Sequence, residues 1–222
     1  EIVNANYALF VQSNIGTETY MPNHLSKINP DHLQYFKFCG RIVAKAIYDE
    51  QLLDCHFTRA FYKQILGKRV SWRDMEAVDE AHFKTLMWMT ENDITGVLDL
   101  TFSVDVLEFG ETKVVDLKPN GQNIEVTEEN KDEYIRLLCE MKLVNAVQEQ
   151  MQHFLDGFHE VIPKEEIAIF NEQELEMIIN GLPDVDIDDL KAHTEYASGY
   201  TASSPQIQWF WRAVRTFDRE LC

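Results

Sequence analysis

The longest apolar run of the chain predicts a buried helix between residues 30 and 53. One set of apolar residues recurs there at helical spacing: Leu33, Phe36, Gly40, Val43 and Ile47. Apolar side chains also fill most of the other directions around the axis, and a helix that is apolar nearly all round is buried inside a fold. We therefore predict that this helix is the centre of a globular fold.

Three basic residues at i, i+4 and i+8, namely Lys37, Arg41 and Lys45, predict the solvent-exposed edge of this helix. They argue against a membrane span. Pro30 is a favourable first residue, because it has no N–H to leave unpaired and its φ is already helical. Gly40 weakens a helix, so its presence predicts that a second backbone packs closely against it.

The rest of the chain alternates between helical and strand patterns. Helical spacing predicts helices over 58–66 and 80–91, from Thr127 to Pro163 with a break near 142–145, over 175–179, and from Pro205 to Val214. Ser71 is expected to cap a short helix at 72–75. Strict alternation predicts a strand over 98–104, followed by strands over 112–117 and 123–126 around a tight hairpin turn at 118–121, where Asn-Gly occurs.

These elements predict an α+β fold. A large helical subdomain comprises about residues 1–78 and 141–222, and a smaller helix/β-hairpin subdomain comprises about residues 79–140. The smaller piece has a surplus of large apolar side chains: Trp88, Met89, Leu98, Tyr134 and Leu138. Exposed aromatic and Met residues often form grooves for a partner protein. The alternative, that these residues form the local core, stays open.

Composition narrows the class of protein. At 222 residues with 45% apolar and 26% charged content, the chain suits one globular domain or two small ones. The net charge of −18 disfavours nucleic acid as a partner, because phosphate binding needs clustered Lys and Arg. We find no signal-peptide pattern and no uncharged apolar run of 18 residues, so no membrane span is expected.

No cofactor or metal is expected either. The four cysteines, at 39, 55, 139 and 222, show no C-x-x-C pairing, which favours reduced structural thiols in an intracellular compartment. Four acidic residues match positions one, three, five and twelve of a calcium loop: Asp184, Asp186, Asp188 and Glu195. The sixth position of such a loop requires glycine for its sharp turn, and here it is Asp189, so a calcium site is rejected.

The amino-acid sequence of the chain resembles that of a known family over essentially all 222 residues. The blocks that carry the resemblance include NPDHLQYFKFCGRIVAKAIYD, FTRAFYKQILGK, DLKPNGQNIEVTEENKDEY, FNEQELEMIINGLPDVDIDDLKAHTEY and IQWFWRAV. They resemble the amino-terminal lobe of HECT-type ubiquitin-protein ligases, and within that family the sequence is most similar to that of the large Mule-type ligases.

The resemblance implies the non-catalytic half of a two-lobe ubiquitin transferase. Such a lobe recruits a ubiquitin-conjugating enzyme loaded with ubiquitin, and a carboxy-terminal lobe supplies the cysteine that accepts ubiquitin and passes it to substrate lysines. The T-C-F-type context of that cysteine does not occur here. We therefore expect that the carboxy-terminal lobe is absent, that this chain alone is inactive, and that substrates bind through regions outside it. The resemblance also implies a location in the cytoplasm, the nucleus or both.

The resemblance also implies two binding surfaces, whose residues are assigned from the matching positions of the family's sequence. The groove for the conjugating enzyme maps to Leu86, Met89, Leu98, Leu100, Tyr134 and Leu138. The surface for a non-covalently bound ubiquitin maps to Asn4, Tyr7 and Phe109.

Two other hypotheses remain. The chain could be an α-helical protein-interaction module with no role in ubiquitin transfer, which would leave ubiquitin and its conjugating enzymes unbound. The least favoured hypothesis is an autonomous thiol enzyme that uses Cys222 or Cys139.

Overall fold

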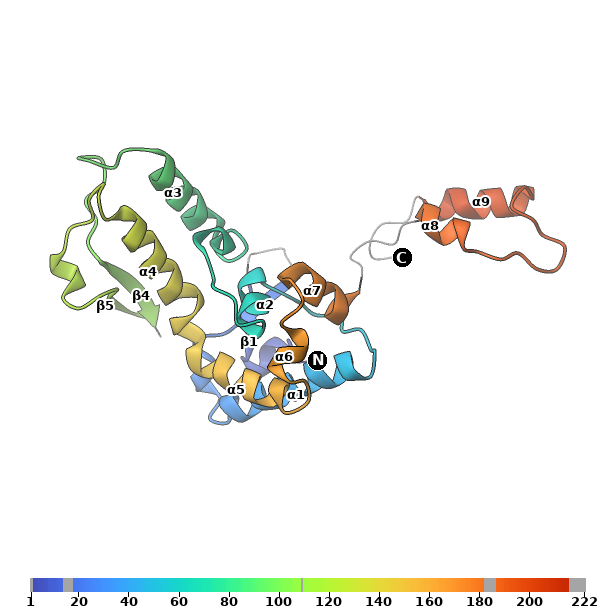
Figure 1. Cartoon of the computed structure of the whole chain (residues 1–222), viewed down its shortest axis with the longest axis horizontal. Helices are drawn as coiled ribbons and strands as arrows, with labels where there is room; N and C mark the ends of the chain where they lie inside the picture. The colour runs from blue at the N-terminus through green and yellow to red at the C-terminus, as the bar shows by residue number, and fades with distance from the viewer. Residues whose placement is uncertain (1, 14–17, 109, 182–186, 216–222) are drawn as a thin grey trace. The chain divides into compact units, whose positions relative to one another are not determined.

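The computed structural model of the chain describes residues 2–13, 18–108, 110–181 and 187–215 (Figure 1). Internal contacts divide the chain into two compact units, residues 1–180 and 181–222. Residues 181–222, which the sequence pattern assigned to the helical body, are the second of these units.

The first unit contains seven α-helices among its described residues: α1 (His32–Tyr48), α2 (Arg59–Ile65), α3 (Glu80–Glu91), α4 (Lys131–Leu143), α5 (Gln148–His159), α6 (Lys164–Ile167) and α7 (Glu172–Asn180). Short 3₁₀ helices connect them: η1 (Ala5–Tyr7), η2 (Ser26–Ile28), η3 (Trp72–Met75), η4 (Gly121–Asn123) and η5 (Asn145–Val147). The strands are β1 (Phe10–Gln12), β2 (Thr19–Pro22), β3 (His56–Phe57), β4 (Ser103–Glu108) and β5 (Glu111–Asp116). The predicted helix break is confirmed, because α4 and α5 are separate helices joined by η5. The structure is α+β, as the sequence predicted.

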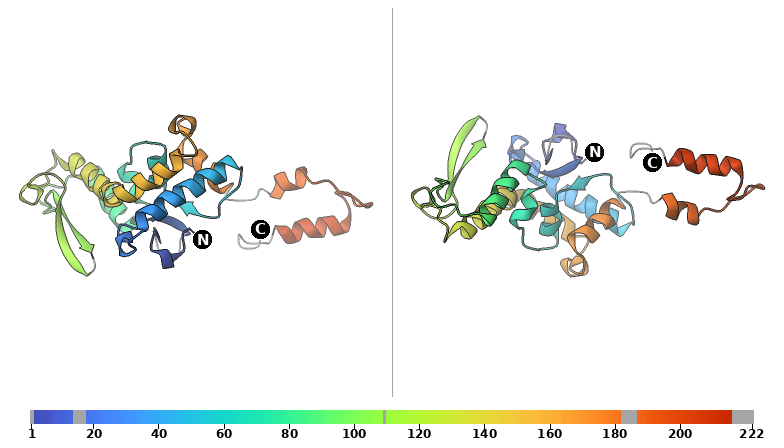
Figure 2. Two further views of the ribbon diagram at one scale, coloured as in Figure 1. Left: turned by 90° about the horizontal axis from the view of Figure 1, so that it is seen from below. Right: turned by 90° about the horizontal axis from the view of Figure 1, so that it is seen from above.

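Helices α1 and α5 lie side by side and form the centre of the first unit (Figure 2). A Cβ built on Gly40 of α1 would lie 2.0 Å from the carbonyl oxygen of Phe154. On the facing helix, a Cβ built on Gly157 would lie 1.9 Å from the carbonyl oxygen of Lys37. The close backbone approach predicted from Gly40 is therefore confirmed, and it is made by a glycine on each helix.

Aromatic rings fill the core around these two helices. The ring of Phe61 on α2 stacks on that of Phe57 at a centroid distance of 4.4 Å and meets that of Phe154 edge-on at 4.9 Å. Phe10 on β1 packs against Phe57 at 5.3 Å. All four side chains are buried, and burial of one such ring stabilises a fold by roughly 1.5–3 kcal/mol. The three-stranded sheet β1–β2–β3, in which β2 pairs antiparallel with β1 and parallel with β3, supplies Phe10 and Phe57.

Helix α1 is less completely buried than its sequence predicts. It ends at Tyr48, before the expected limit of residue 53, and it leaves Tyr35, Phe38 and Tyr48 exposed. The predicted solvent-exposed edge is present, since Arg41 and Lys45 are exposed and Lys37 is half-buried. The cause is that α5 covers only the Gly40 side of α1: Lys37 and Arg41 border that contact and pair with Glu160 at the end of α5, whereas Tyr35, Phe38 and Tyr48 remain uncovered.

The predicted hairpin turn at residues 118–121 is wrong. The hairpin is β4–β5, in which Glu108 pairs with Glu111 and Gly110 between them has a φ of +85°. A two-residue Asn-Gly hairpin turn needs positive φ at both residues, and of this pair only Asn120 has it. Gly121 serves a different purpose, because its added Cβ would lie 2.0 Å from the carbonyl oxygen of Phe102. The predicted strand over 123–126 is reduced to a bridge between Glu125 and Thr101.

The second unit contains α8 (Ile187–Ala192) and α9 (Pro205–Val214) among its described residues. Pro205 opens α9, as predicted. The buried Trp211 donates from Nε1 to the hydroxyl of Tyr196 at 2.9 Å, which joins α9 to the loop between the two helices. Trp209 and Phe210 on the same helix are exposed.

Candidate functional site

All six residues assigned to the conjugating-enzyme groove belong to one apolar cluster, built where α3 packs on α4: Leu86, Met89, Leu98, Leu100, Tyr134 and Leu138. Leu86 and Met89 are three residues apart on α3, and Tyr134 and Leu138 are four apart on α4, so each pair lies on one helix face. The ring of Phe102 meets Tyr134 edge-on at 5.6 Å and closes the cluster.

Burial divides these six residues into two groups. Leu86, Met89 and Leu138 are at most 1% exposed, and Tyr134 is 6% exposed. Leu98 and Leu100 are half-buried at the edge of the cluster. The sequence left open whether this surplus forms a groove or a local core, and the four buried residues form local core. A partner could touch only Leu98 and Leu100 without opening that core.

Two exposed apolar residues of α3 are absent from the six assigned to the groove. Met87 and Trp88 on α3 are 37% and 39% exposed. Helix α3 has only two fully buried positions, Leu86 and Met89, and Phe83 is half-buried. The sequence flagged Trp88 as part of an apolar surplus but contained no signal that it is exposed. We call Met87, Trp88, Leu98 and Leu100 the α3 surface.

Both ends of α3 are fixed to α4 by polar contacts. At the start, Asp79 Oδ1 caps the helix by accepting from the His82 backbone N–H at 2.9 Å, and Lys142 Nζ lies 3.2 Å from His82 Nδ1. Burial, reinforced by Lys142, lowers the pKa of His82. At the other end, Lys131 Nζ donates to the Asn92 carbonyl oxygen at 2.8 Å. The α3 surface is therefore presented on a helix that is held at both ends.

Two of the three residues assigned to non-covalent ubiquitin binding, Asn4 and Tyr7, lie in and beside the short helix η1. Asn4 caps η1 by accepting from the Asn6 backbone N–H at 2.9 Å, and Tyr7 is half exposed at the end of the same turn. Asn29 Nδ2 donates to the Tyr7 carbonyl oxygen at 3.4 Å, which places this turn beside the entry to α1. The structure brings Asn4 and Tyr7 together, whereas Phe109 lies outside the described residues.

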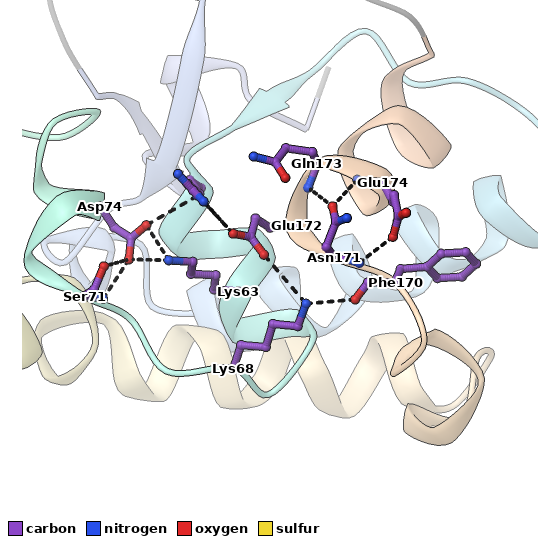
Figure 3. A network of polar contacts seen from close by, with 10 residues as sticks. Lys63, Lys68, Ser71, Asp74, Phe170, Asn171, Glu172, Gln173 and Glu174 are labelled. Atoms are coloured by element: carbon purple, nitrogen blue, oxygen red, sulfur yellow. Dashed lines mark hydrogen bonds and ion pairs between the residues drawn. The ribbon is translucent and has the colours of Figure 1, made fainter.

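A buried carboxylate fixes the segment that leads into α3 (Figure 3). The side chain of Asp74 on η3 is fully buried, and both of its oxygens accept from Lys63 Nζ at 2.8 Å. Its Oδ2 also accepts from the backbone N–H and the hydroxyl of Ser71, at 2.7 and 3.0 Å, which completes the cap predicted at Ser71. The neighbouring Arg59 donates to Glu172 on α7 at 2.8 Å, and this hydrogen bond lowers the pKa of Glu172.

The described cysteines are not suited to nucleophilic chemistry. Cys39, Cys55 and Cys139 are free and buried, and burial raises the pKa of the first two thiols to about 11 and of the third to about 12. These thiols are protonated at neutral pH, whereas the thiolate is the reactive form. Cys222, like Asp184 and Asp186 of the rejected calcium loop, lies outside the described residues.

Across the part of the chain that the structure describes, no group of three or more potential ligands is arranged to hold a metal ion. No helix in that same part is long and apolar enough to cross a membrane.

Comparison with known proteins identifies the class. A family model described as "HECT-domain (ubiquitin-transferase)" matches residues 1–221. The chain therefore belongs to the HECT-domain family, and the resemblance read from the sequence is confirmed.

Individual relatives agree with the family model. The chain is 60% identical over 99% of its length to "E3 ubiquitin-protein ligase TOM1-like" of Neurospora crassa, and 56% identical over 99% to "E3 ubiquitin-protein ligase HUWE1" of Mus musculus. It spans 5% of the length of each of these two relatives. It is 48% identical over 99% of its length to "E3 ubiquitin-protein ligase HACE1" of Danio rerio, of which it spans 24%.

Proposed function

We propose that this chain is the lobe of a HECT-type ubiquitin ligase that recruits a ubiquitin-loaded conjugating enzyme through the α3 surface. The observation that carries the proposal is the exposure of Trp88 and Met87 on a helix that is fixed at both ends, with half-buried Leu98 and Leu100 in the segment that follows it. Clustered exposed Trp and Met residues are typical of protein-binding surfaces. In this proposal Leu86, Met89, Tyr134 and Leu138 support the surface from beneath.

The binding is expected to be weak. One or two aromatic anchors carry most of the energy in a small interface, and the cost of association removes much of it. We expect dissociation constants in the micromolar range, on the order of −8 kcal/mol or weaker. Weak binding suits an enzyme that must release its discharged partner before it takes a new one.

An NMR titration tests the proposal. The ¹⁵N-labelled chain is titrated with a panel of ubiquitin-conjugating enzymes, and amide shifts are followed for every assigned residue. The proposal expects that shifts for at least one enzyme concentrate on residues 84–100. Shifts confined to α9, where Trp209 is also exposed, would place the partner elsewhere. If the whole panel leaves the spectrum unchanged, the α-helical interaction module becomes the better hypothesis.

In the proposed reaction the accepting cysteine lies outside this chain. The conjugating enzyme's thioester is attacked by a thiolate, its own thiol leaves, and ubiquitin then passes to a lysine amine of a substrate bound by other regions. Raised pKa values exclude the three described cysteines from that first step. Mixing the chain with a charged conjugating enzyme should yield no reductant-sensitive adduct, and an adduct lost in Cys222→Ser would contradict this.

A second part of the proposal assigns non-covalent ubiquitin binding to Asn4, Tyr7 and Phe109. What supports it is the half-exposed ring of Tyr7 on a turn that Asn4 caps. Tyr7→Ala should abolish amide shifts on adding free ubiquitin while leaving conjugating-enzyme binding unchanged; equal shifts in both variants would contradict the assignment. Residence in the cytoplasm or nucleus stays a prediction.

A further inference from the structure

A basic concavity lies between α4 and the segment that follows α2. It has a volume of about 430 Å³. Lys68 and Arg69 form one wall, Arg136 and Glu140 of α4 form the other, and Val70 contributes apolar lining. The site uses none of the residues assigned above to the conjugating enzyme or to ubiquitin.

The charge of this concavity is opposite to that of the whole chain. The chain carries a net charge of −18, yet three cations and a single carboxylate line the concavity. Cations gathered in a hollow raise the local concentration of anions, because low-dielectric walls focus the field. Among the lining residues alone the excess is two positive charges, against about −1.5 to −2 for a phosphate monoester at neutral pH; Glu172, which lies 3.7 Å from Lys68 Nζ, is outside the lining.

The hydrogen-bond donors of these cations are available to a ligand. Arg69 makes no ion pair with any residue that the structure describes, and its side chain is exposed. Arg136 meets Glu140 at 3.3 Å, an exposed i, i+4 pair of the kind that contributes little and is readily exchanged. Lys68 Nζ donates to the Phe170 carbonyl oxygen at 2.9 Å and lies 3.7 Å from Glu172, so the ammonium keeps donors to spare.

The two walls are held in place independently of any ligand. Gln64 of α2 donates from Nε2 to the carbonyl oxygen of Leu143, at the end of α4, at 3.1 Å. Val70 and Val144 pack against the apolar cluster beneath and form the apolar part of the lining. Walls that are already in place reduce the entropy that an anion must lose to order its binding site.

We infer that this concavity binds a phosphate monoester group, with Arg69 and Arg136 as guanidinium forks and Lys68 as a point charge. Planar guanidinium groups match the spacing of phosphate oxygens and bind them with two hydrogen bonds. The group is supplied either by a free phosphate or by a phosphorylated side chain of a peptide, and both present the same oxygens.

An NMR titration at constant ionic strength and pH 7 tests this inference. The ¹⁵N-labelled chain is titrated separately with sodium phosphate, with the tripeptide Ala-phosphoSer-Ala, with unphosphorylated Ala-Ser-Ala, and with sodium chloride as the reference. We expect saturable shifts of amides in residues 64–70 and 136–144 with the phosphate-bearing probes. Saturation with both probes indicates a site for free phosphate, and saturation with the phosphopeptide alone indicates a peptide site.

Variants separate a site from a general charge effect. Arg69→Glu should weaken binding at least 10-fold, and Glu140→Gln should tighten it several-fold because it removes the only lining carboxylate. Lys45→Glu is the matched control, since Lys45 is an exposed cation on α1 paired with Asp49 and takes no part in the lining. Shifts that fail to saturate, that equal those with chloride, or that persist in Arg69→Glu would overturn the inference.

Discussion

Gly40 of α1 and Phe154 of α5 meet backbone to backbone, and a methyl group in place of the glycine hydrogen would lie 2.0 Å from the Phe154 carbonyl oxygen. No rotamer change relieves such an overlap, because the obstructing atom belongs to the backbone. The contact therefore sets the distance between the two helices around which the larger core of the first unit is built.

Replacement of Gly40 by Ala is expected to destabilise the protein by about 3 kcal/mol or more, since overpacking of a tight core costs roughly 1–3 kcal/mol even where side chains can yield. Helix propensity alone predicts the opposite, a gain of up to about 1 kcal/mol. Urea unfolding followed by circular dichroism measures the difference. Gly96→Ala is the control, because its added Cβ meets no atom within 4 Å and only its φ of +69° is strained. A Gly40→Ala variant as stable as the parent would show that α1 and α5 are farther apart.

Removal of the Asp74 carboxylate is expected to cost about 3 kcal/mol, because Asp74→Ala leaves the ammonium of Lys63 without its partner in a largely buried position. Glu172→Gln should cost less than about 1 kcal/mol, because the side chain of its partner Arg59 is half exposed. Urea unfolding of both variants gives the comparison. Equal losses would mean that Asp74 has no special role in holding η3.

Acid should destabilise the fold through His32. His32 is buried, and its Nδ1 lies 3.0 Å from the Ser26 hydroxyl, which also accepts from Gln150 Nε2 at 3.1 Å. Burial lowers the pKa of His32, nearby His153 lowers it further, and Glu149 opposes both. The unfolded chain therefore binds the proton more readily, and stability is lost as the pH falls below 6.5 toward the folded-state pKa.

His32→Gln should make the loss of stability between pH 6.5 and 4.5 less steep. His82, whose pKa is also lowered, remains and keeps part of the dependence. Urea midpoints at a series of pH values measure the slope. His193→Gln is the control, because His193 is exposed in the second unit. An unchanged slope in His32→Gln would contradict the lowered pKa of His32 in the folded protein.

The sequence predicted those parts of the fold that local signals determine. The bounds of α3, the cap at Ser71, the break after α4 and the close approach at Gly40 all follow from capping, spacing or the absence of a side chain. The hairpin was misplaced because Asn-Gly was interpreted as a hairpin turn. Glycine is needed at position 121 for another reason, which is the close approach of the Phe102 backbone. That approach is a long-range contact, which no local pattern contains.

The six residues that the family resemblance assigned to the groove fall in one apolar cluster. The sequence did not separate Leu86 and Leu138, which are buried, from Trp88, which is exposed. Exposure depends on how α4 covers α3, and that is a property of the packed pair. The basic concavity was missed for the same reason, since Arg69 and Arg136 are far apart in sequence.

The affinity of the Trp88→Ala variant for a conjugating enzyme tests the central claim most directly. Isothermal titration is made with the enzyme that shifts the amides of residues 84–100 most, with Trp209→Ala in the second unit as the matched control for loss of an exposed Trp. The account predicts that Trp88→Ala weakens binding at least 10-fold, about 1.4 kcal/mol or more, while Trp209→Ala binds like the parent. Equal affinities of the parent and the Trp88→Ala variant would contradict it.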